Sequence, residues 1–193
     1  MRVLVACEAS GVVRDAFIAR GHDAISCDLL PTAVPGPHYQ GDVLDILGDG
    51  WDLMVAHPPC TFLSNSGVRW LTTDLTRWPK LIEGAVFFRE LLQAPIPRVA
   101  VENPVMHHFA SDIIGSRQTQ TIQPWQFGHD ASKRTGFWLR GLPELVPTDV
   151  LIKKQYANQT PSGQNKLGPS PQRAALRAVT YTGIAKGMAE QWG

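Results

Sequence analysis

The sequence has few cysteines, almost no net charge and no long apolar run. Its 193 residues include three cysteines, Cys7, Cys27 and Cys60, and none has a partner at a short spacing. We therefore expect no disulfide framework. We expect the protein to reside in a reducing compartment, and the cytoplasm is the first candidate. Because no apolar stretch reaches bilayer-spanning length and the amino end enters a strand-like run rather than a signal peptide, we expect no membrane protein.

Size and composition are those of an ordinary one-domain protein. With 44% hydrophobic and 18% charged residues, the chain can bury a sizeable core. The formal net charge of +1 is unevenly distributed, because residues 129–193 carry 9 lysines and arginines against 4 acidic residues. This basic third of the chain could face phosphates, or it could be an ordinary solvated surface.

The first 28 residues have the pattern of a βαβ unit. A strand is predicted over residues 2–7, a helix over 11–20 that ends at Gly21, and a second strand over 22–28. This strand ends in Asp28, where a Rossmann-like fold places the carboxylate that accepts a ribose hydroxyl. The turn at residues 7–11 lacks the GxGxxG fingerprint, however, so a plain strand–helix connection is the alternative.

The rest of the chain continues to alternate strands with helices. We expect a loop over residues 31–37 and a second strand-end acid at Asp42. Further elements are a strand over 53–56, a polar loop over 61–67 that could close over a site, a helix over 78–92, a short strand over 98–104 that runs into a turn, and a helix over 182–191 packed near the first helix. For His107 and His108 we expect surface or helix-start positions rather than metal ligation, because no suitably spaced ligand lies nearby.

Cys60 is the most informative single residue. The apolar residues 53–56 predict a strand buried inside a parallel sheet, and Pro58 and Pro59 then impose a rigid turn. This turn places the Cys60 thiol at the carboxyl edge of the sheet, where α/β proteins bind ligands, so Cys60 is a candidate nucleophile. The alternative is a buried cysteine that happens to end a proline turn.

Taken together, these segments resemble the motif series of cytosine-C5 DNA methyltransferases, particularly the short versions encoded by bacteriophages. The resemblance rests on Glu8-Ala9-Ser10-Gly11, Asp28, Asp42, Pro58-Pro59-Cys60, Glu102-Asn103-Pro104, the basic segment 127–135 and the final segment 180–185. It implies a single domain over residues 1–193 with a Rossmann-like methyltransferase fold, a largely parallel sheet with helices on both faces. The implied activity is methyl transfer from S-adenosylmethionine to C5 of cytosine in DNA, inside the bacterial host cell.

The chemistry of cytosine explains why these residue types occur together. Carbon 5 is a poor nucleophile, so a soft nucleophile first adds at carbon 6, and an ionised Cys60 suits that role. An ordinary thiol has a pKa of about 8.5, so Cys60 needs a positive environment or a helix amino terminus. A carboxylic acid at ring atom N3 would stabilise the adduct, which requires Glu102 to hold its proton through partial burial. By the resemblance, Lys133 or Arg134 binds the O2 side, and the sequence does not decide between them.

The resemblance also implies which residues bind the ligands. It places S-adenosylmethionine against Cys7, Glu8, Ala9, Ser10, Gly11, Asp28, Leu29, Asp42, Val43, Pro58, Gly183 and Ile184. Residues expected to contact the substrate are Pro59, Ser64, Asn103, Lys153, Lys154 and Lys166. No metal ion is implied.

Residues 141–179 stand where family members insert a target-recognition domain. Arg, Asn, Gln and Lys side chains, which suit base edges and phosphates, occur throughout this short interval, Arg173 and Arg177 among them. We interpret it as a minimal DNA-contacting loop, and a flexible connector is the alternative. Duplex activity would require the cytosine to flip out of the helix. Single-stranded DNA and a free nucleotide are therefore alternative substrates, and a homodimer is an alternative way to act on a duplex.

Two other classes of protein stay in consideration. One is a binding or decoy protein that keeps the methyltransferase fold without its catalysis. The other is a cysteine hydrolase in which His57 or His107 serves as the base for Cys60, although it leaves Glu102, Asn103 and the series of acids unexplained. Methyltransferases that act on amino groups normally have an aromatic residue after the two prolines, so Cys60 favours carbon as the acceptor.

Overall fold

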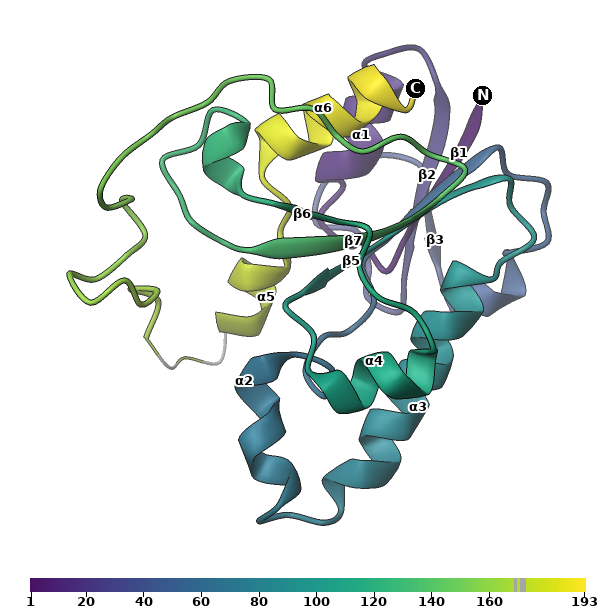
Figure 1. The fold of residues 1–193 in the computed structure, drawn as a ribbon. Helices are drawn as coiled ribbons and strands as arrows, with labels where there is room; N and C mark the ends of the chain where they lie inside the picture. The colour runs from purple at the N-terminus through teal and green to yellow at the C-terminus, as the bar shows by residue number, and fades with distance from the viewer. Residues whose placement is uncertain (169, 171–172) are drawn as a thin grey trace.

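A seven-stranded sheet forms the centre of the computed structural model, which describes residues 1–168, 170 and 173–193 (Figure 1). Its order is β3-β2-β1-β4-β5-β7-β6, in which β3 to β5 run parallel and β7 runs antiparallel to both of its neighbours. The strands are β1 Arg2–Ala6, β2 Asp23–Asp28, β3 His38–Gln40, β4 Leu53–Ala56, β5 Arg98–Pro104, β6 Gln120–Ile122 and β7 Thr135–Arg140. The predicted fold class, a largely parallel α/β sheet, is confirmed.

Helices cover both faces of this sheet (Figure 1). The helical elements are α1 Val12–Ile18, α2 Asn65–Val68, α3 Arg77–Leu92, α4 His108–Ile114, α5 Arg173–Ala178 and α6 Thr182–Gln191, with short 3-10 turns η1 Val43–Asp45, η2 Arg69–Leu71 and η3 Pro124–Gln126. Helices α1 and α6 pack on one face, and α3 and α4 on the other. In the described part of the chain, we find no helix long and apolar enough to cross a membrane.

Alternation along the strands produces two separate core layers. In β1, Val3 and Val5 face α1 and α6, whereas Leu4 and Ala6 face α3, and all four are fully buried. Strand β4 alternates in the same way. Because both faces are covered, these strands are continuous apolar runs rather than half-polar ones, as expected for a buried parallel sheet.

The first helix ends as predicted. Gly21 has a φ of +82°, its N–H donates to the Ile18 carbonyl at 2.9 Å, and the N–H of His22 donates to the Phe17 carbonyl at 3.1 Å. This pair of bonds is a Schellman motif, which needs a residue with positive φ at the position of Gly21. The chain then turns directly into β2.

The segment predicted as a polar loop over residues 61–67 is fixed at its middle. Leu63 is fully buried, and its carbonyl accepts a hydrogen bond from His107 N at 3.1 Å. Asn65 N donates to the Val105 carbonyl at 2.9 Å, and helix α2 begins at that asparagine. The loop prediction is therefore wrong from Asn65 onward, because one buried leucine anchors an otherwise polar sequence.

The short strand expected over residues 98–104 is β5, which continues through Pro104. Antiparallel β7 pairs with this stretch, with Glu102 opposite Phe137 and Asn103 opposite Gly136. A partner that lies about thirty residues further along the chain cannot be seen in local periodicity.

His107 begins α4, as expected, but it does not lie on the surface. Its Nδ1 accepts a hydrogen bond from Ala110 N at 3.2 Å, its Nε2 lies 3.0 Å from the Phe62 carbonyl, and it is buried. His108 is exposed. Among the described residues, no group of histidine, cysteine and acidic side chains could hold a metal ion.

Helix α6 has the bounds and the position expected of it, packed along α1 (Figure 1). Gly183 lets it approach the turn after η3, because a Cβ at this position would lie 1.9 Å from the Phe127 carbonyl oxygen. The N–H of Gly183 also donates to His129 Nε2 at 2.8 Å. A close backbone approach is thus a sufficient reason for a glycine here.

We expect Gly183→Ala to destabilise the protein, although alanine is normally the better helix former by about 1 kcal/mol. The new methyl group must push α6 away from Phe127, which should lower the free energy of unfolding by about 1–3 kcal/mol. Urea denaturation measures this change. Gly48→Ala is the matched control, since a Cβ there meets nothing within 4 Å. Equal stability of the two variants would contradict the packing role.

Candidate functional site

The parallel pairing of β4 with β5 brings two predicted motifs together. Ala56 and Val101 are register partners at the ends of the paired segment, so the residues that follow them, His57 and Glu102, lie side by side. His57 Nδ1 is 3.3 Å from Glu102 Oε2. Cys60 follows after the two prolines and is partly buried, close enough to Glu102 for the two charges to interact.

The His57–Glu102 pair is nearly enclosed. Their side chains are 8% and 14% exposed. His57 Nε2 and Glu102 Oε1 are buried, and neither finds a hydrogen-bond partner among the described residues. Buried polar atoms without partners are costly, so these two are available to a ligand. A cavity of about 10 Å³, the size of one water, lies beside the pair, with Thr135, Tyr181 and Ile184 among its lining residues.

Lys133, rather than Arg134, lies at this pair. The charge of Lys133 acts on both Cys60 and Glu102, and its Nζ donates to the Arg177 carbonyl at 2.7 Å. Arg134 is exposed. The sequence could not separate these neighbours, because the side chain that points toward the sheet edge depends on where β7 begins.

The expectation that Glu102 holds its proton is wrong for the free protein. Burial acts to raise the pKa of Glu102, but the hydrogen bond to His57 and the positive charges of Lys133 and His57 outweigh it and lower the pKa below its usual range. Glu102 is therefore ionised at neutral pH. The sequence did not indicate this because the interaction of His57 with Glu102 depends on strand pairing.

Cys60 is not activated in the free protein either. Burial and the negative charge of Glu102 raise the pKa of the thiol, and the charges of Lys133 and Arg177 offset this only in part. The predicted positive environment is present, but its effect on the thiol pKa is smaller than the combined effect of burial and Glu102. Arg177 is the residue here whose effect the sequence did not indicate, since it comes from α5, far along the chain.

Alkylation of Cys60 should report these charges directly. Since the thiolate is the reactive form, the rate of iodoacetamide labelling should rise with pH through a midpoint above that of an ordinary thiol. Glu102→Gln removes the repelling charge and should lower the midpoint, with labelling at pH 7.5 roughly threefold to tenfold faster, whereas Lys133→Met should raise it. Peptide mass spectrometry measures the rates residue by residue.

Cys60→Ser provides the background for this experiment. Burial raises the pKa of Cys7 to about 12 and that of Cys27 to about 11, so both should label slowly. A midpoint for Cys60 that Glu102→Gln leaves unchanged would mean that the carboxylate does not act on the thiol.

A separate cavity of about 190 Å³ lies at the carboxyl ends of β1 and β2, and Pro59 reaches it from the neighbouring turn. Six of the residues predicted to bind the cofactor or the substrate line this cavity, namely Cys7, Asp28, Leu29, Asp42, Val43 and Pro59. Cys27, Gly41 and Phe87 complete the lining. Asp28 Oδ1 accepts from Leu30 N at 2.9 Å and Asp42 Oδ1 accepts from Leu44 N at 3.0 Å, which holds both carboxylates at the rim.

This combination of groups fits a nucleoside. Carboxylates can accept hydrogen bonds from ribose hydroxyls or an exocyclic amine, and Leu29, Val43 and Phe87 offer apolar contact to the faces of a base. The volume lies below the range of about 300–1,000 Å³ typical of sites for whole small molecules. The cavity would therefore hold only part of a larger ligand.

The other predicted cofactor residues lie outside this lining. Glu8 is buried, and its carboxylate accepts hydrogen bonds from Ser10 Oγ at 2.9 Å and from Val13 N at 2.8 Å, so it fixes the start of α1. Gly11 precedes that helix with a φ of +75°, and the Ala9 carbonyl accepts a bond from Ala33 N at 2.7 Å. Pro58 is buried. Gly183 and Ile184 lie at the start of α6, on the side of the His57–Glu102 pair.

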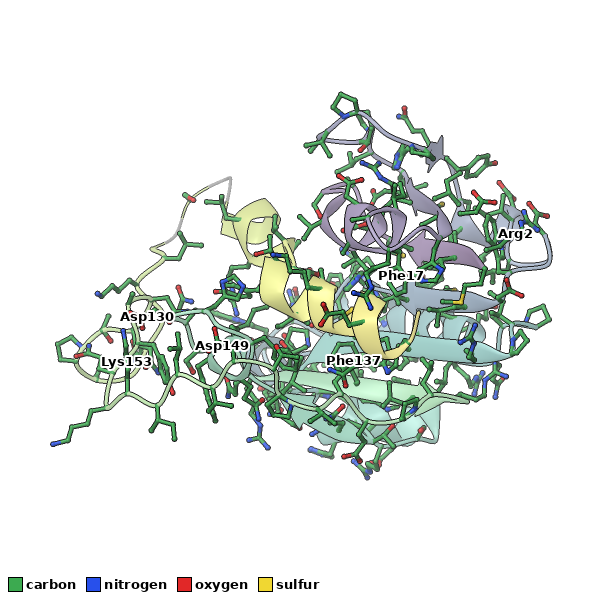
Figure 2. The ribbon with its side chains drawn as sticks, turned by 90° about the horizontal axis from the view of Figure 1, so that it is seen from above. Arg2, Phe17, Asp130, Phe137, Asp149 and Lys153 are labelled. Atoms are coloured by element: carbon green, nitrogen blue, oxygen red, sulfur yellow. The ribbon has the colours of Figure 1, made fainter. Side chains whose placement is uncertain are left out.

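The predicted substrate residues are spread over the structure. Ser64 is buried and bridged to Met106. Asn103 is fully buried, and its amide has no hydrogen-bond partner among the described residues. Lys153 forms an ion pair with Asp130 at 2.5 Å, at the end of the molecule opposite Arg2 (Figure 2). Lys154 is exposed, and Lys166 Nζ donates to the Ala157 carbonyl at 2.9 Å.

The interval 141–179 is mostly irregular, as expected, but it contains a helix. Residues 141–168 form loops with isolated bridges, and α5 follows at Arg173–Ala178. Pro169 and Pro171 of the predicted loop lie outside the described residues, and so does the side chain of Arg173. In Figure 1 the interval leaves the sheet after β7, runs along the outside of the molecule and returns through α5 to α6.

Of the two histidines considered as a hydrolytic base, His57 keeps a ring nitrogen, Nε2, without a partner among the described residues, and His107 does not. Both ring nitrogens of His107 are engaged, with Ala110 N and with the Phe62 carbonyl. His57 directs Nδ1 to Glu102. The arrangement gathers a thiol, a carboxylate and a cation at one sheet edge, beside a cavity that suits a nucleoside.

The fold is similar to that of a solved structure, whereas no similarity of sequence is found. No protein-family model matches the chain, and no curated protein matches it by sequence. Among solved structures, it is similar to a candidate DNA modification methyltransferase encoded within a prophage of E. coli, with 13% identity and a TM-score of 0.50 over 78% of this chain and 51% of that one. The chain thus spans about half the length of that protein. At this identity the likeness bears on the fold alone, an α/β fold built on a largely parallel sheet.

A second solved structure is more distant. It is that of WbdD crystallised with the kinase inhibitor LY294002, with 11% identity and a TM-score of 0.42 over 76% of this chain and 37% of that one. It adds nothing to the fold assignment.

Proposed function

We propose that this protein is an S-adenosylmethionine-dependent DNA cytosine-C5 methyltransferase that acts through a covalent adduct between Cys60 and carbon 6 of the base. The observation that carries the proposal is that Glu102 and Lys133 line one small cavity beside His57, with Cys60 two prolines after His57 and subject to both of their charges. A soft nucleophile, a carboxyl group and a cation are the three groups that activation of carbon 5 requires. The likeness to the prophage protein adds support for DNA as the substrate.

Cys60 attacks as the thiolate. Its sulfur forms a bond to carbon 6, and the electron pair of the 5,6 double bond moves toward carbon 5. Lys133, which lies at both Cys60 and Glu102, would stabilise negative charge that develops on the O2 side. Because Cys60 is largely a thiol in the free protein, entry of the base must also shift its ionisation, by bringing a proton to Glu102 and so reducing the repulsion between the two.

Glu102 would meet the N3 edge of the base through its unpaired Oε1. N3 of neutral cytosine accepts hydrogen bonds, so Glu102 must carry a proton in the complex. That proton must be carried on Oε1, and the proton released when the Cys60 thiol ionises balances it. His57 Nδ1, 3.3 Å from Oε2, holds the other carboxyl oxygen and so orients Glu102 toward the base.

The cavity at Cys7, Asp28 and Asp42 would hold the nucleoside part of S-adenosylmethionine, and the residues present fit it. When bound, that cofactor supplies an electrophilic methyl group on a sulfonium. After methylation of carbon 5, the proton on that carbon passes to water, and the electron pair of the broken C–H bond re-forms the 5,6 double bond and expels the Cys60 sulfur as thiolate. Cys60, Glu102 and His57 then return to their starting states.

The test is nucleoside mass spectrometry of cytosine-rich DNA, duplex and single-stranded, after incubation with the protein and S-adenosylmethionine. We expect 5-methylcytosine with the wild type, none with Cys60→Ala, and at least a tenfold lower rate with Glu102→Gln, since loss of one proton-transferring group typically costs about 10²–10⁴-fold.

A matched control keeps the experiment specific. Arg117→Ala changes an exposed side chain, paired with Asp112, that lines neither the cavity beside Glu102 nor the cofactor cavity, and it should still methylate. If folded wild-type protein methylates neither DNA, the catalytic proposal fails and a DNA-binding or decoy role replaces it. If it methylates single strands alone, base flipping from a duplex is excluded.

A further inference from the structure

A second, larger cavity adjoins the catalytic residues. It measures about 420 Å³ and lies between residues 157–167 and the stretch from α5 to the start of α6. Its volume falls within the range of about 300–1,000 Å³ that is typical of small-molecule sites. Part of the interval 141–179 therefore lines a pocket. Recognition of a base sequence in duplex DNA would instead need an extended open surface.

The charged residues in the described lining of this cavity are all positive. Lys133, Lys166 and Arg177 contribute to its wall, and none of the lining residues that the structure describes is acidic. Lys133 and Lys166 each donate one hydrogen bond to a backbone carbonyl, which leaves further ammonium donors on both. The guanidinium of Arg177 donates no hydrogen bond to the residues that the structure describes, so its fork of donors is available to an anion.

The remaining lining suits the uncharged part of a nucleotide. Leu167, Leu176, Val179 and Tyr181 supply apolar surface. The side chain of Asn158, also in the wall, is held by two hydrogen bonds of 2.9 Å with the backbone of Ser132, which ties the cavity to the chain segment of Lys133. Cations beside apolar surface match a phosphate attached to a sugar and base.

The cavity shares part of its wall with the proposed reaction site. Lys133, Thr180 and Tyr181 line both this cavity and the small one beside His57 and Glu102. The charge of Arg177 reaches the Cys60 thiol. A cytosine that presents N3 to Glu102 would therefore have its sugar and phosphate within reach of these cations.

We propose that this cavity binds the phosphate of the nucleotide that carries the target cytosine, with Arg177 and Lys166 as its main contacts. The inference rests on the proposed function for the identity of the base. It makes the interval 141–179 a pocket for one nucleotide rather than a reader of duplex sequence. The phosphate can belong to a free cytidine monophosphate or to a single strand of DNA, and the chemistry of recognition is the same.

Equilibrium binding without cofactor tests this proposal apart from catalysis. Calorimetry would compare deoxycytidine, deoxycytidine monophosphate and a short single-stranded cytosine oligonucleotide on the wild type and on the double variant Lys166→Ala/Arg177→Ala. We expect at least one phosphate-bearing ligand to bind the wild type about tenfold more tightly than deoxycytidine, and the double variant to lose that advantage. For the oligonucleotide, the slope of log affinity against log salt should fall by about one.

Arg117→Ala is the matched control, because Arg117 is an exposed arginine paired with Asp112 at 2.7 Å and does not line the cavity. Unchanged binding of deoxycytidine shows that the double variant is folded. A phosphate advantage confined to the monophosphate identifies a free nucleotide as the ligand, and one confined to the oligonucleotide identifies a strand. Equal affinities for all three ligands, or an equal loss in Arg117→Ala, would overturn the proposal.

The two proposals fail in different ways. Phosphate-dependent binding without 5-methylcytosine would remove the catalytic function and leave the nucleotide pocket. The opposite result is also possible to distinguish. If the double variant methylates every substrate at the wild-type rate, and phosphate gives no advantage in binding, the proposed nucleotide pocket is wrong and the catalytic function stands.

Discussion

The parallel pairing of β4 with β5 is the constraint on which the site depends. Register partners Ala56 and Val101 end the paired segment, and the sheet therefore places His57 beside Glu102. The two prolines after His57 then stop the strand and leave Cys60 at the same edge. Loss of this register by one residue would exchange the faces of every side chain in β4, so the site and the two core layers are specified by one pairing.

The antiparallel strand β7 completes the site and explains its charge. It pairs with the end of β5, at Glu102 and Asn103, and it begins just after Lys133. Burial by itself would keep Glu102 protonated. His57 and Lys133 reverse this effect, because a hydrogen bond and a positive charge to the ionised form outweigh the desolvation. The same negative charge then opposes ionisation of Cys60. Under the proposed function, the free protein holds Glu102 ionised and Cys60 as a thiol, and binding of the base reverses both protonation states.

Several residues are explained by structure rather than by chemistry. Glu8 caps α1, Gly183 admits the Phe127 carbonyl, and His107 starts α4 with both ring nitrogens bonded. Glu8 and Gly183 belong to segments that also resemble methyltransferase motifs. Such a segment can both bind a ligand and stabilise a helix end, because the turns at the edge of the sheet lead directly into helices.

The sequence alone determined the alternation of strands and helices, the Schellman end of α1, the bounds of α6 and the acids at the ends of β2 and β3. These follow from local periodicity and from residues whose backbone preferences are strong, such as Gly21 and the Pro58-Pro59 pair. It also supplied Cys60 and Glu102 as candidates, since each ends an apolar run.

Tertiary structure alone decided which neighbours these candidates have. The His57 contact, the choice of Lys133 over Arg134, the position of Arg177 and the ionised state of Glu102 all depend on segments far apart in the chain. Local periodicity carries no information about strand order or about the return of residues 157–181 to the sheet edge. The pKa of a buried group is set by whatever charge the fold brings beside it, and that is fixed only when the strands are paired.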